Sequence, residues 1–182
     1  MATPQEIRRM RLATDYKLLC SIQGDIISWV PIKGEPPYVE EYRITVNVRT
    51  IIGASGDVPV YRDTSVMTIS LPPDYPRQAP KIIMESVPPP FHTDWYTNGR
   101  WSYGRWFVSE SLGDFVIRMV KSLQFDPSSV CEHAPSNYDA ARWYIANKTS
   151  GLFPCDRQEL PVPTGPRPAA SGQSALIIKR RG

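Results

Sequence analysis

The chain of 182 residues has few of the side chains that build metal or disulfide sites. It contains three cysteines, two histidines and no Cys-x-x-Cys pair. Cys20, Cys131 and Cys155 are too few and too scattered for a disulfide framework. With His92 and His133 as the only histidines, a closed structural zinc site is not expected, and no motif indicates a cofactor.

The chain also lacks the features of a membrane, secreted or nucleic-acid-binding protein. No apolar run approaches the roughly 18 residues that a membrane span requires. The N-terminal region holds Arg8, Arg9 and Arg11 and no apolar core of a signal peptide. The net charge of +3 is small, and no aromatic residues alternate with basic ones as in nucleic-acid-binding surfaces. We therefore expect a soluble, cytoplasmic protein with neither a membrane nor a nucleic acid as partner.

The patterns that are present predict one helix followed by four strands. Apolar residues recur at helical spacing over residues 4–21, after a capping box formed by Thr3 and Glu6. The following segments alternate apolar and polar residues or form short apolar runs, and turn residues separate them. We expect these strands at residues 26–32, 42–49, 67–71 and 81–84, with residues 53–57 as a turn between the second and the third. Short connections favour an antiparallel meander with one face covered by a helix.

A long aromatic loop and two more helices complete the predicted domain. Residues 88–108 show no period but include three of the five tryptophans, and long structureless loops in compact domains are usually functional. Helices are expected over residues 112–123 and 136–147, each begun by a serine cap. We predict an α+β domain over residues 1–155 and a proline-rich, basic, flexible or extended tail over residues 156–182, in which a short strand at 175–178 is an alternative.

Several motifs resemble those of the ubiquitin-conjugating-enzyme family. The run Leu-Pro-Pro-Asp-Tyr-Pro-Arg-Gln-Ala-Pro-Lys at residues 71–81 is similar to the family's signature after its third strand. Residues 91–94, Phe-His-Thr-Asp, resemble the family's aromatic-His-Pro-Asn element, and Asn98-Gly99 matches its tight turn. Ten residues after the histidine, where the family has its catalytic cysteine, this chain has Ser102. The resemblance covers roughly residues 3–150.

The resemblance implies the E2 or UBC fold and an acyl-carrier activity. Such a carrier receives the activated C-terminus of a ubiquitin-like protein from an E1-like activating enzyme and delivers it to an acceptor amine, with or without a ligase. Position 102 would carry the acyl group, and backbone N–H groups of residues 99–103 would stabilise the oxyanion. The divergent motifs suggest a remote branch, such as a bacterial ubiquitin-like pathway.

Ser102 leaves three interpretations open, because a hydroxyl is much harder to ionise than a thiol. It is a native nucleophile that forms an oxyester with the help of a base. Alternatively, it is an engineered replacement of a cysteine that would form a thioester. The third interpretation is a catalytically silent variant that acts as a binding module for a ubiquitin-like protein.

Two neighbouring residues are further candidates for catalysis. Asp94 stands where the family has asparagine, and a carboxylate there serves either as a general base or as the cap of a local turn. His92 could act with Ser102, but the family's histidine braces the loop, and no Gly-x-Ser-x-Gly motif supports a serine-hydrolase triad.

The remaining candidates follow from other positions in the family. Cys131 lies in a segment that the family fold brings near the active site, which makes it a candidate alternative nucleophile. The resemblance implicates Arg8, Arg9 and Arg11 in binding the activating enzyme, with a solvated charged face as the alternative. Arg77 occupies a position where the family often has an aromatic residue that docks a ligase, so we expect either no ligase or a different one.

Overall fold

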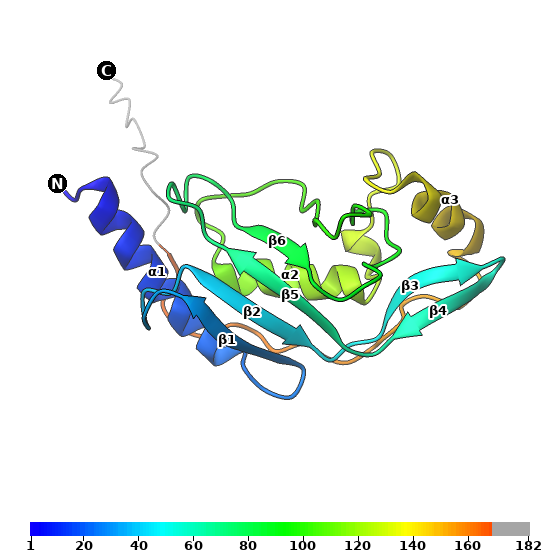
Figure 1. Cartoon of the computed structure of the whole chain (residues 1–182), viewed down its shortest axis with the longest axis horizontal. Helices are drawn as coiled ribbons and strands as arrows, with labels where there is room; N and C mark the ends of the chain where they lie inside the picture. The colour runs from blue at the N-terminus through cyan, green and yellow to red at the C-terminus, as the bar shows by residue number, and fades with distance from the viewer. Residues whose placement is uncertain (169–182) are drawn as a thin grey trace, which may run out of the picture.

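The structure is a computed structural model, and it describes residues 1–168. The chain forms an α+β fold with a four-stranded antiparallel sheet, a separate hairpin and three α-helices (Figure 1). In chain order the elements are α1 (Pro4–Ser21), β1 (Ile27–Lys33), β2 (Glu41–Val46), β3 (Thr50–Ser55), β4 (Val58–Arg62), β5 (Ser65–Ser70), β6 (Lys81–Met84), α2 (Leu112–Leu123) and α3 (Tyr138–Asn147), with a 3₁₀ turn at Pro127–Ser129. No helix within this described part is long and apolar enough to cross a bilayer.

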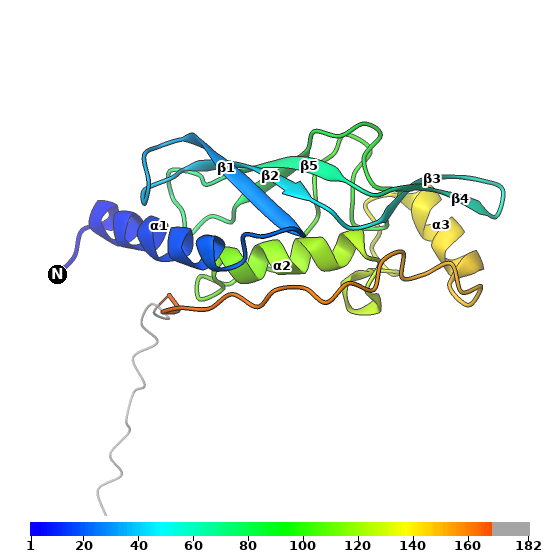
Figure 2. The same ribbon diagram turned by 90° about the horizontal axis from the view of Figure 1, so that it is seen from below.

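The predicted antiparallel sheet of four strands is confirmed. Its order is β1-β2-β5-β6, and neighbouring strands pair antiparallel. Alternation places one side of each strand inward, so that Ile44 of β2 lies opposite Met67 of β5 and both are fully buried. The helices α1 and α2 lie against the same face of this sheet (Figure 2). Their apolar residues and those of the sheet form the main core.

The hairpin β3–β4 corrects the prediction of a plain turn at residues 53–57. The turn is shorter, at Gly56-Asp57, and Ser55 pairs with Val58 at its base. Adjacent isoleucines and a glycine in β3, and Pro59 in β4, interrupt the alternation that would have predicted these strands. The hairpin projects beyond the main sheet and packs beside α3 (Figure 1). There the indole N–H of Trp143 donates to the Gly56 carbonyl at 2.8 Å.

Two of the three predicted N-cap residues are confirmed. Thr3 and Glu6 form the predicted capping box of α1, and Ser111 accepts the backbone N–H of Asp114 at 3.0 Å at the start of α2. The predicted cap of α3, Ser136, is one residue early. The cap is Asn137, whose side chain accepts the backbone N–H of Ala140 at 3.0 Å.

A buried carboxylate, Asp15, joins α1 to two distant segments. It accepts Nε–H of Arg11 at 2.6 Å, the backbone N–H of Leu112 at 2.8 Å and the hydroxyl of Tyr75. Tyr75 belongs to the proline-rich segment at residues 71–80, here called the proline turn, and its fully buried side chain anchors that segment. Burial raises the pKa of the Asp15 carboxyl, and the Coulombic attraction of Arg11 opposes that rise.

Arg11 was expected to bind the activating enzyme or to lie on a solvated face of α1. Both interpretations require an exposed side chain, and the structure contradicts them. Its side chain is buried, and it donates to the backbone carbonyls of Val108 and Glu110 in addition to its ion pair with Asp15. The helical pattern could not reveal these acceptors, because they lie about a hundred residues away in the sequence. Arg11 therefore fixes the chain just before α2.

The segment after α3 runs in an extended form along α2 and back to α1 (Figure 2). We call residues 156–168 the strap. Its Pro163 packs on Gly113 of α2, and its Thr164 N–H donates to Ser21 Oγ at 2.9 Å. The packed unit thus continues past residue 155, and the segment 175–178, where a strand was the alternative, lies outside the described residues.

The Asp15 network predicts that two ion pairs, one in α1 and one in α3, contribute very different amounts to the free energy of unfolding. Asp15→Ala leaves the buried Arg11 guanidinium without its partner, and we expect the free energy of unfolding to fall by about 3–5 kcal/mol. The control is Asp139→Ala, which removes the exposed pair with Arg142 and should cost less than about 0.5 kcal/mol. Urea titrations of both variants measure the difference. Equal losses would contradict a central role for Asp15.

The strap predicts that the cost of one substitution in α2 depends on Pro163. A Cβ added at Gly113 would lie 3.0 Å from Pro163 Cβ and 3.3 Å from Leu18 Cβ. We expect Gly113→Ala to destabilise the chain by about 1 kcal/mol, because overpacking exceeds the gain in helix propensity.

In a Pro163→Gly background the contact with the strap disappears while the contact with Leu18 Cβ remains, so the same substitution should destabilise the chain clearly less than in the native background. Thermal or urea unfolding of the four proteins of this cycle measures the difference. An identical effect of Gly113→Ala in the two backgrounds would show that the strap does not press on α2.

Candidate functional site

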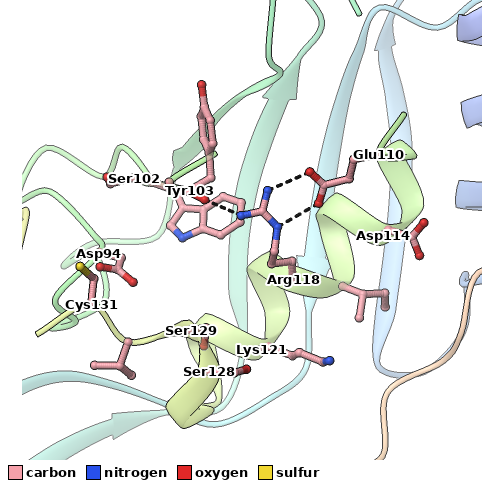
Figure 3. Close-up of a pocket in the computed structure, with 14 residues that line it drawn as sticks. Asp94, Ser102, Tyr103, Glu110, Asp114, Arg118, Lys121, Ser128, Ser129 and Cys131 are labelled. Atoms are coloured by element: carbon pink, nitrogen blue, oxygen red, sulfur yellow. Dashed lines mark hydrogen bonds and ion pairs between the residues drawn. The ribbon is translucent and has the colours of Figure 1, made fainter. Parts of the chain in front are cut away.

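A cleft of about 650 Å³ lies between the aromatic loop, one side of α2 and the segment after α2 (Figure 3). It brings together three of the predicted candidates, Ser102, Asp94 and Cys131. The full lining consists of Asp94, Trp101, Ser102, Tyr103, Gly104, Glu110, Asp114, Ile117, Arg118, Lys121, Ser128, Ser129, Val130 and Cys131. The sequence separations among these residues show that only the tertiary fold assembles the cleft.

The aromatic loop is held rigidly by a tight turn against the sheet. Gly99 has φ +86°, and a Cβ there would lie 2.8 Å from the Met84 carbonyl oxygen of β6, so only glycine fits. The predicted Asn98-Gly99 turn is confirmed by the Gly99 N–H, which donates to Tyr96 O at 2.9 Å. Isolated antiparallel bridges join Ile83 to Arg100 and Trp95 to Trp101.

Two buried indoles form the floor of this loop. Trp95 is fully buried, and its Nε1–H donates to Ser122 Oγ of α2 at 3.0 Å. Trp101 stacks on Trp95 with ring centroids 6.2 Å apart and meets Phe115 of α2 edge-on at 5.1 Å. The loop carrying Ser102 is therefore fixed to α2 by large, well-packed rings.

Ser102 itself is half-buried at the wall of the cleft. Its backbone N–H donates to Asp94 O at 2.8 Å, which holds the two residues side by side. Figure 3 shows Asp94 and Cys131 next to each other below Ser102. A hydroxyl, a carboxylate and a thiol thus share one wall of the cleft.

Of the backbone N–H groups of residues 99–103 that were predicted to stabilise an oxyanion, those of residues 99–102 are engaged within the protein. Besides the Gly99 and Ser102 donors already described, the Arg100 N–H donates to Asn98 Oδ1 at 3.0 Å and the Trp101 N–H to Ile82 O at 3.3 Å. The turn and the bridges to the sheet consume these donors. The hydrogen bonds that fix the loop therefore use the N–H groups that would otherwise be available to an oxyanion.

Asp94 has the electrostatic character of a weak general base. Its carboxyl is half-buried, and burial raises its pKa to about 6, while the backbone N–H of Cys131 lowers it in part. At neutral pH the group is ionised, and it releases or accepts a proton close to that pH. The carboxylate therefore has a pKa suited to taking a proton from a neighbouring hydroxyl, thiol or amine.

His92 lies behind the cleft and does not line it. Its imidazole is fully buried against Phe125, and its Nδ1 accepts the backbone N–H of Asp94 at 3.0 Å. Burial lowers its pKa to about 3, so the ring is neutral at physiological pH. This position makes His92 a brace for Asp94 and leaves it out of proton transfer to Ser102.

The α2 wall contains functional candidates that the sequence analysis missed. Arg118 forms two hydrogen bonds with Glu110, at 2.9 and 3.0 Å, and donates to the carbonyls of Tyr103 and Arg105 (Figure 3). Asp114, Arg118 and Lys121 follow one another at helical spacing on a helix that is otherwise apolar. That polar stripe is the signal that could have identified this wall.

The predicted partner-binding arginines lie away from the cleft. Arg8 pairs with Glu40 at 2.8 Å and donates to Pro72 O, and Arg11 is buried as described. Arg9 is exposed and its guanidinium lies 4.0 Å from the centre of the Tyr38 ring. Arg77 is exposed on the proline turn. Of the three arginines of α1, Arg9 is exposed, Arg8 is partly buried and Arg11 is buried.

The cleft offers acid–base and nucleophilic chemistry. Within residues 1–168 no group of three or more His, Cys, Asp or Glu side chains is placed to hold a metal ion.

A scan against protein-family models finds no match to the chain, and a search of curated proteins finds no significant relative.

The pKa of Asp94 predicts that stability depends on this residue and on pH. Because its pKa is raised in the folded state, its favourable contribution is present below about pH 4 and is lost as the pH rises through about 6. Asp94→Asn should therefore stabilise the chain at pH 7.5 by roughly 1 kcal/mol, a value reduced for its partial exposure, and should have little effect near pH 4.

Urea midpoints at the two pH values measure this effect. The control is Asp74→Asn on the exposed part of the proline turn, which should change stability by less than about 0.5 kcal/mol at both. A loss of stability in Asp94→Asn at pH 7.5 would show that the carboxylate makes favourable contacts that outweigh its burial.

Proposed function

We propose that this chain is an E2-type acyl carrier in a ubiquitin-like conjugation pathway. The observation that carries the proposal is the shared wall of the cleft, where Ser102 stands beside a carboxylate whose pKa is about 6. In the proposed reaction the activated C-terminus of a ubiquitin-like protein is accepted at position 102 and then passed to an acceptor amine.

The fold is consistent with this assignment at several independent points. A helix-covered antiparallel meander, a proline turn anchored by Tyr75 and a tryptophan-fixed loop lie in the order that the resemblance implies. We take the fold to be UBC-like, with the hairpin β3–β4 as an addition between the second and third strands of the meander. The agreement supports a common architecture for the loop around Ser102.

Loading proceeds by transfer of an acyl group between nucleophiles. The Ser102 hydroxyl attacks the thioester carbonyl that the activating enzyme presents, and its proton passes to the Asp94 carboxylate. The C–S bond breaks, the thiolate of the activating enzyme leaves, and an oxyester forms on Ser102. In discharge an acceptor amine attacks the ester carbonyl, the C–O bond to Ser102 breaks and an amide forms. The proton lost by the amine passes through Asp94 to the Ser102 oxygen. If Ser102 replaces a native cysteine, the native intermediate is a thioester at the same place.

The positions of the other candidates refine the proposed partners. Arg8 and Arg11 are engaged within the chain, so binding of the activating enzyme through α1 rests on Arg9. Arg77 is free to meet a ligase or target with an acidic surface. Cys131 is exposed in the same cleft and remains the alternative acceptor.

A binding module for a ubiquitin-like protein is the second candidate function. The observation that favours it is the engagement of the backbone donors at residues 99–102, which leaves them unable to stabilise an oxyanion. In that case the cleft would hold the C-terminal segment of the partner without bond formation.

Adduct chemistry distinguishes these functions. We expect the full chain, incubated with its activating enzyme, the ubiquitin-like protein and ATP, to form an adduct that resists thiol reductant and is cleaved by hydroxide. Ser102→Ala should abolish it, and the control Ser128→Ala, a neighbouring hydroxyl of the cleft, should retain it. If Asp94 is the base, the loading rate rises as the pH passes through about 6, and Asp94→Asn removes that rise.

The other outcomes identify the alternatives. A reductant-labile adduct that is lost in Cys131→Ala moves the acceptor to Cys131. Noncovalent binding without any adduct, in the native chain and in Ser102→Cys, supports the binding module. A reductant-labile adduct in Ser102→Cys alone indicates that the serine replaces a cysteine.

A further inference from the structure

Four of the five tryptophans donate their indole N–H to an acceptor within the protein, and Trp101 is the exception. Trp29 donates to Leu19 O at 3.0 Å, Trp95 to Ser122 Oγ at 3.0 Å, Trp106 to Pro76 O at 2.7 Å and Trp143 to Gly56 O at 2.8 Å. Trp101 has no acceptor among residues 1–168, although its Nε1 is buried. Buried indole donors normally find a partner, so this exception requires an explanation.

The position of Trp101 supplies the explanation. Six buried side-chain atoms in the described part of the chain lack a hydrogen-bond partner: Tyr42 Oη, Thr50 Oγ1, Arg62 Nη2, His92 Nε2, Thr93 Oγ1 and Trp101 Nε1. Of these residues only Trp101 lines the cleft, and it is the immediate neighbour of Ser102. The residue that carries this unpaired donor thus forms part of the cleft wall, next to Ser102 in the chain.

The ring cannot rotate easily to find an acceptor within the protein. Trp101 is only 4% exposed and is packed against Trp95, Phe115 and Tyr103. The Arg118 guanidinium lies 5.4 Å from the ring centre and is itself held by Glu110. An unpaired buried donor is unfavourable by about 1–3 kcal/mol, which a ligand acceptor would recover on binding.

The charges around the cleft indicate a neutral acceptor. The Glu110 carboxylate neutralises the Arg118 guanidinium, and Asp94 adds a negative charge on the opposite wall. These carboxylates disfavour an anionic ligand, whereas a peptide carbonyl carries no net charge and accepts strongly. Lys121, the remaining cation of the lining, is exposed to solvent.

We propose that the Trp101 indole N–H, which has no acceptor among residues 1–168, donates a hydrogen bond to a bound ligand. In the proposed reaction this bond positions a peptide carbonyl of the incoming C-terminal segment beside Ser102. It provides a side-chain donor where the backbone N–H groups of residues 99–102 are already engaged. Trp101 acts as a positioning residue. The choice of a glycine-ended peptide as ligand rests on the proposed function, whereas the requirement for a carbonyl acceptor does not.

The test follows the five indole N–H signals of the ¹⁵N-labelled full chain by NMR. Trp101→Phe, which keeps the aromatic packing, assigns the Trp101 signal by its loss. A short synthetic peptide ending in Gly-Gly should shift this signal downfield to saturation and leave those of Trp29 and Trp143 in place. The peptide should bind Trp101→Phe roughly tenfold more weakly, and the control Trp143→Phe with unchanged affinity.

A second probe, N-methylacetamide, separates the failure of this inference from the failure of the proposed function. If the peptide does not bind but N-methylacetamide shifts the Trp101 signal, the donor role holds and the proposed peptide ligand is wrong. If the peptide shifts the backbone signals of Ser102 and Cys131 while the Trp101 indole stays unmoved, the donor role is overturned and the proposed function survives. The donor role is also overturned if neither probe moves the indole signal, or if Trp101→Phe binds the peptide as tightly as the native chain.

Discussion

The buried carboxylate of Asp15 is the interaction on which the arrangement of the cleft depends. It accepts the N–H of Leu112, the first residue of α2, and the hydroxyl of Tyr75 in the proline turn. Its ion-pair partner Arg11 holds the carbonyl of Glu110, whose side chain in turn holds Arg118 on the cleft wall. A chain of charge-assisted hydrogen bonds therefore runs from the core of α1 to the wall of the cleft.

The opposite wall is fixed by aromatic packing. The indoles of Trp95 and Trp101 lie between the sheet and α2, and Ser122 of α2 accepts the Trp95 N–H. This packing places Ser102 firmly but uses most of the backbone donors of its loop. The same geometry leaves the Trp101 N–H as a buried donor at the cleft. The rigidity of the loop and the unpaired indole N–H thus arise from a single cluster of rings.

The strap connects the candidate site to the chain beyond the main core. Its Arg167 pairs with Asp114, which also lines the cleft, and Pro163 covers Gly113 one residue earlier in α2. The exposed side of α2 is therefore shared between the cleft and the strap. Asp114 of the polar stripe on α2 thus takes part in both the cleft and the contact with the strap.

The sequence by itself determined the features that depend on neighbours close in the chain. The capping box at Thr3, the alternation in β2 and the Asn98-Gly99 turn each need only a few adjacent residues, and the structure has all three. The grouping of Ser102, Asp94 and Cys131 was expected from a family resemblance, and the fold places them in one cleft. Tertiary structure alone decided the burial of Arg11, the engagement of the loop's backbone donors and the unpaired state of the Trp101 indole. Each of these depends on where acceptors from distant segments lie in space, and local periodicity carries no information about those distances.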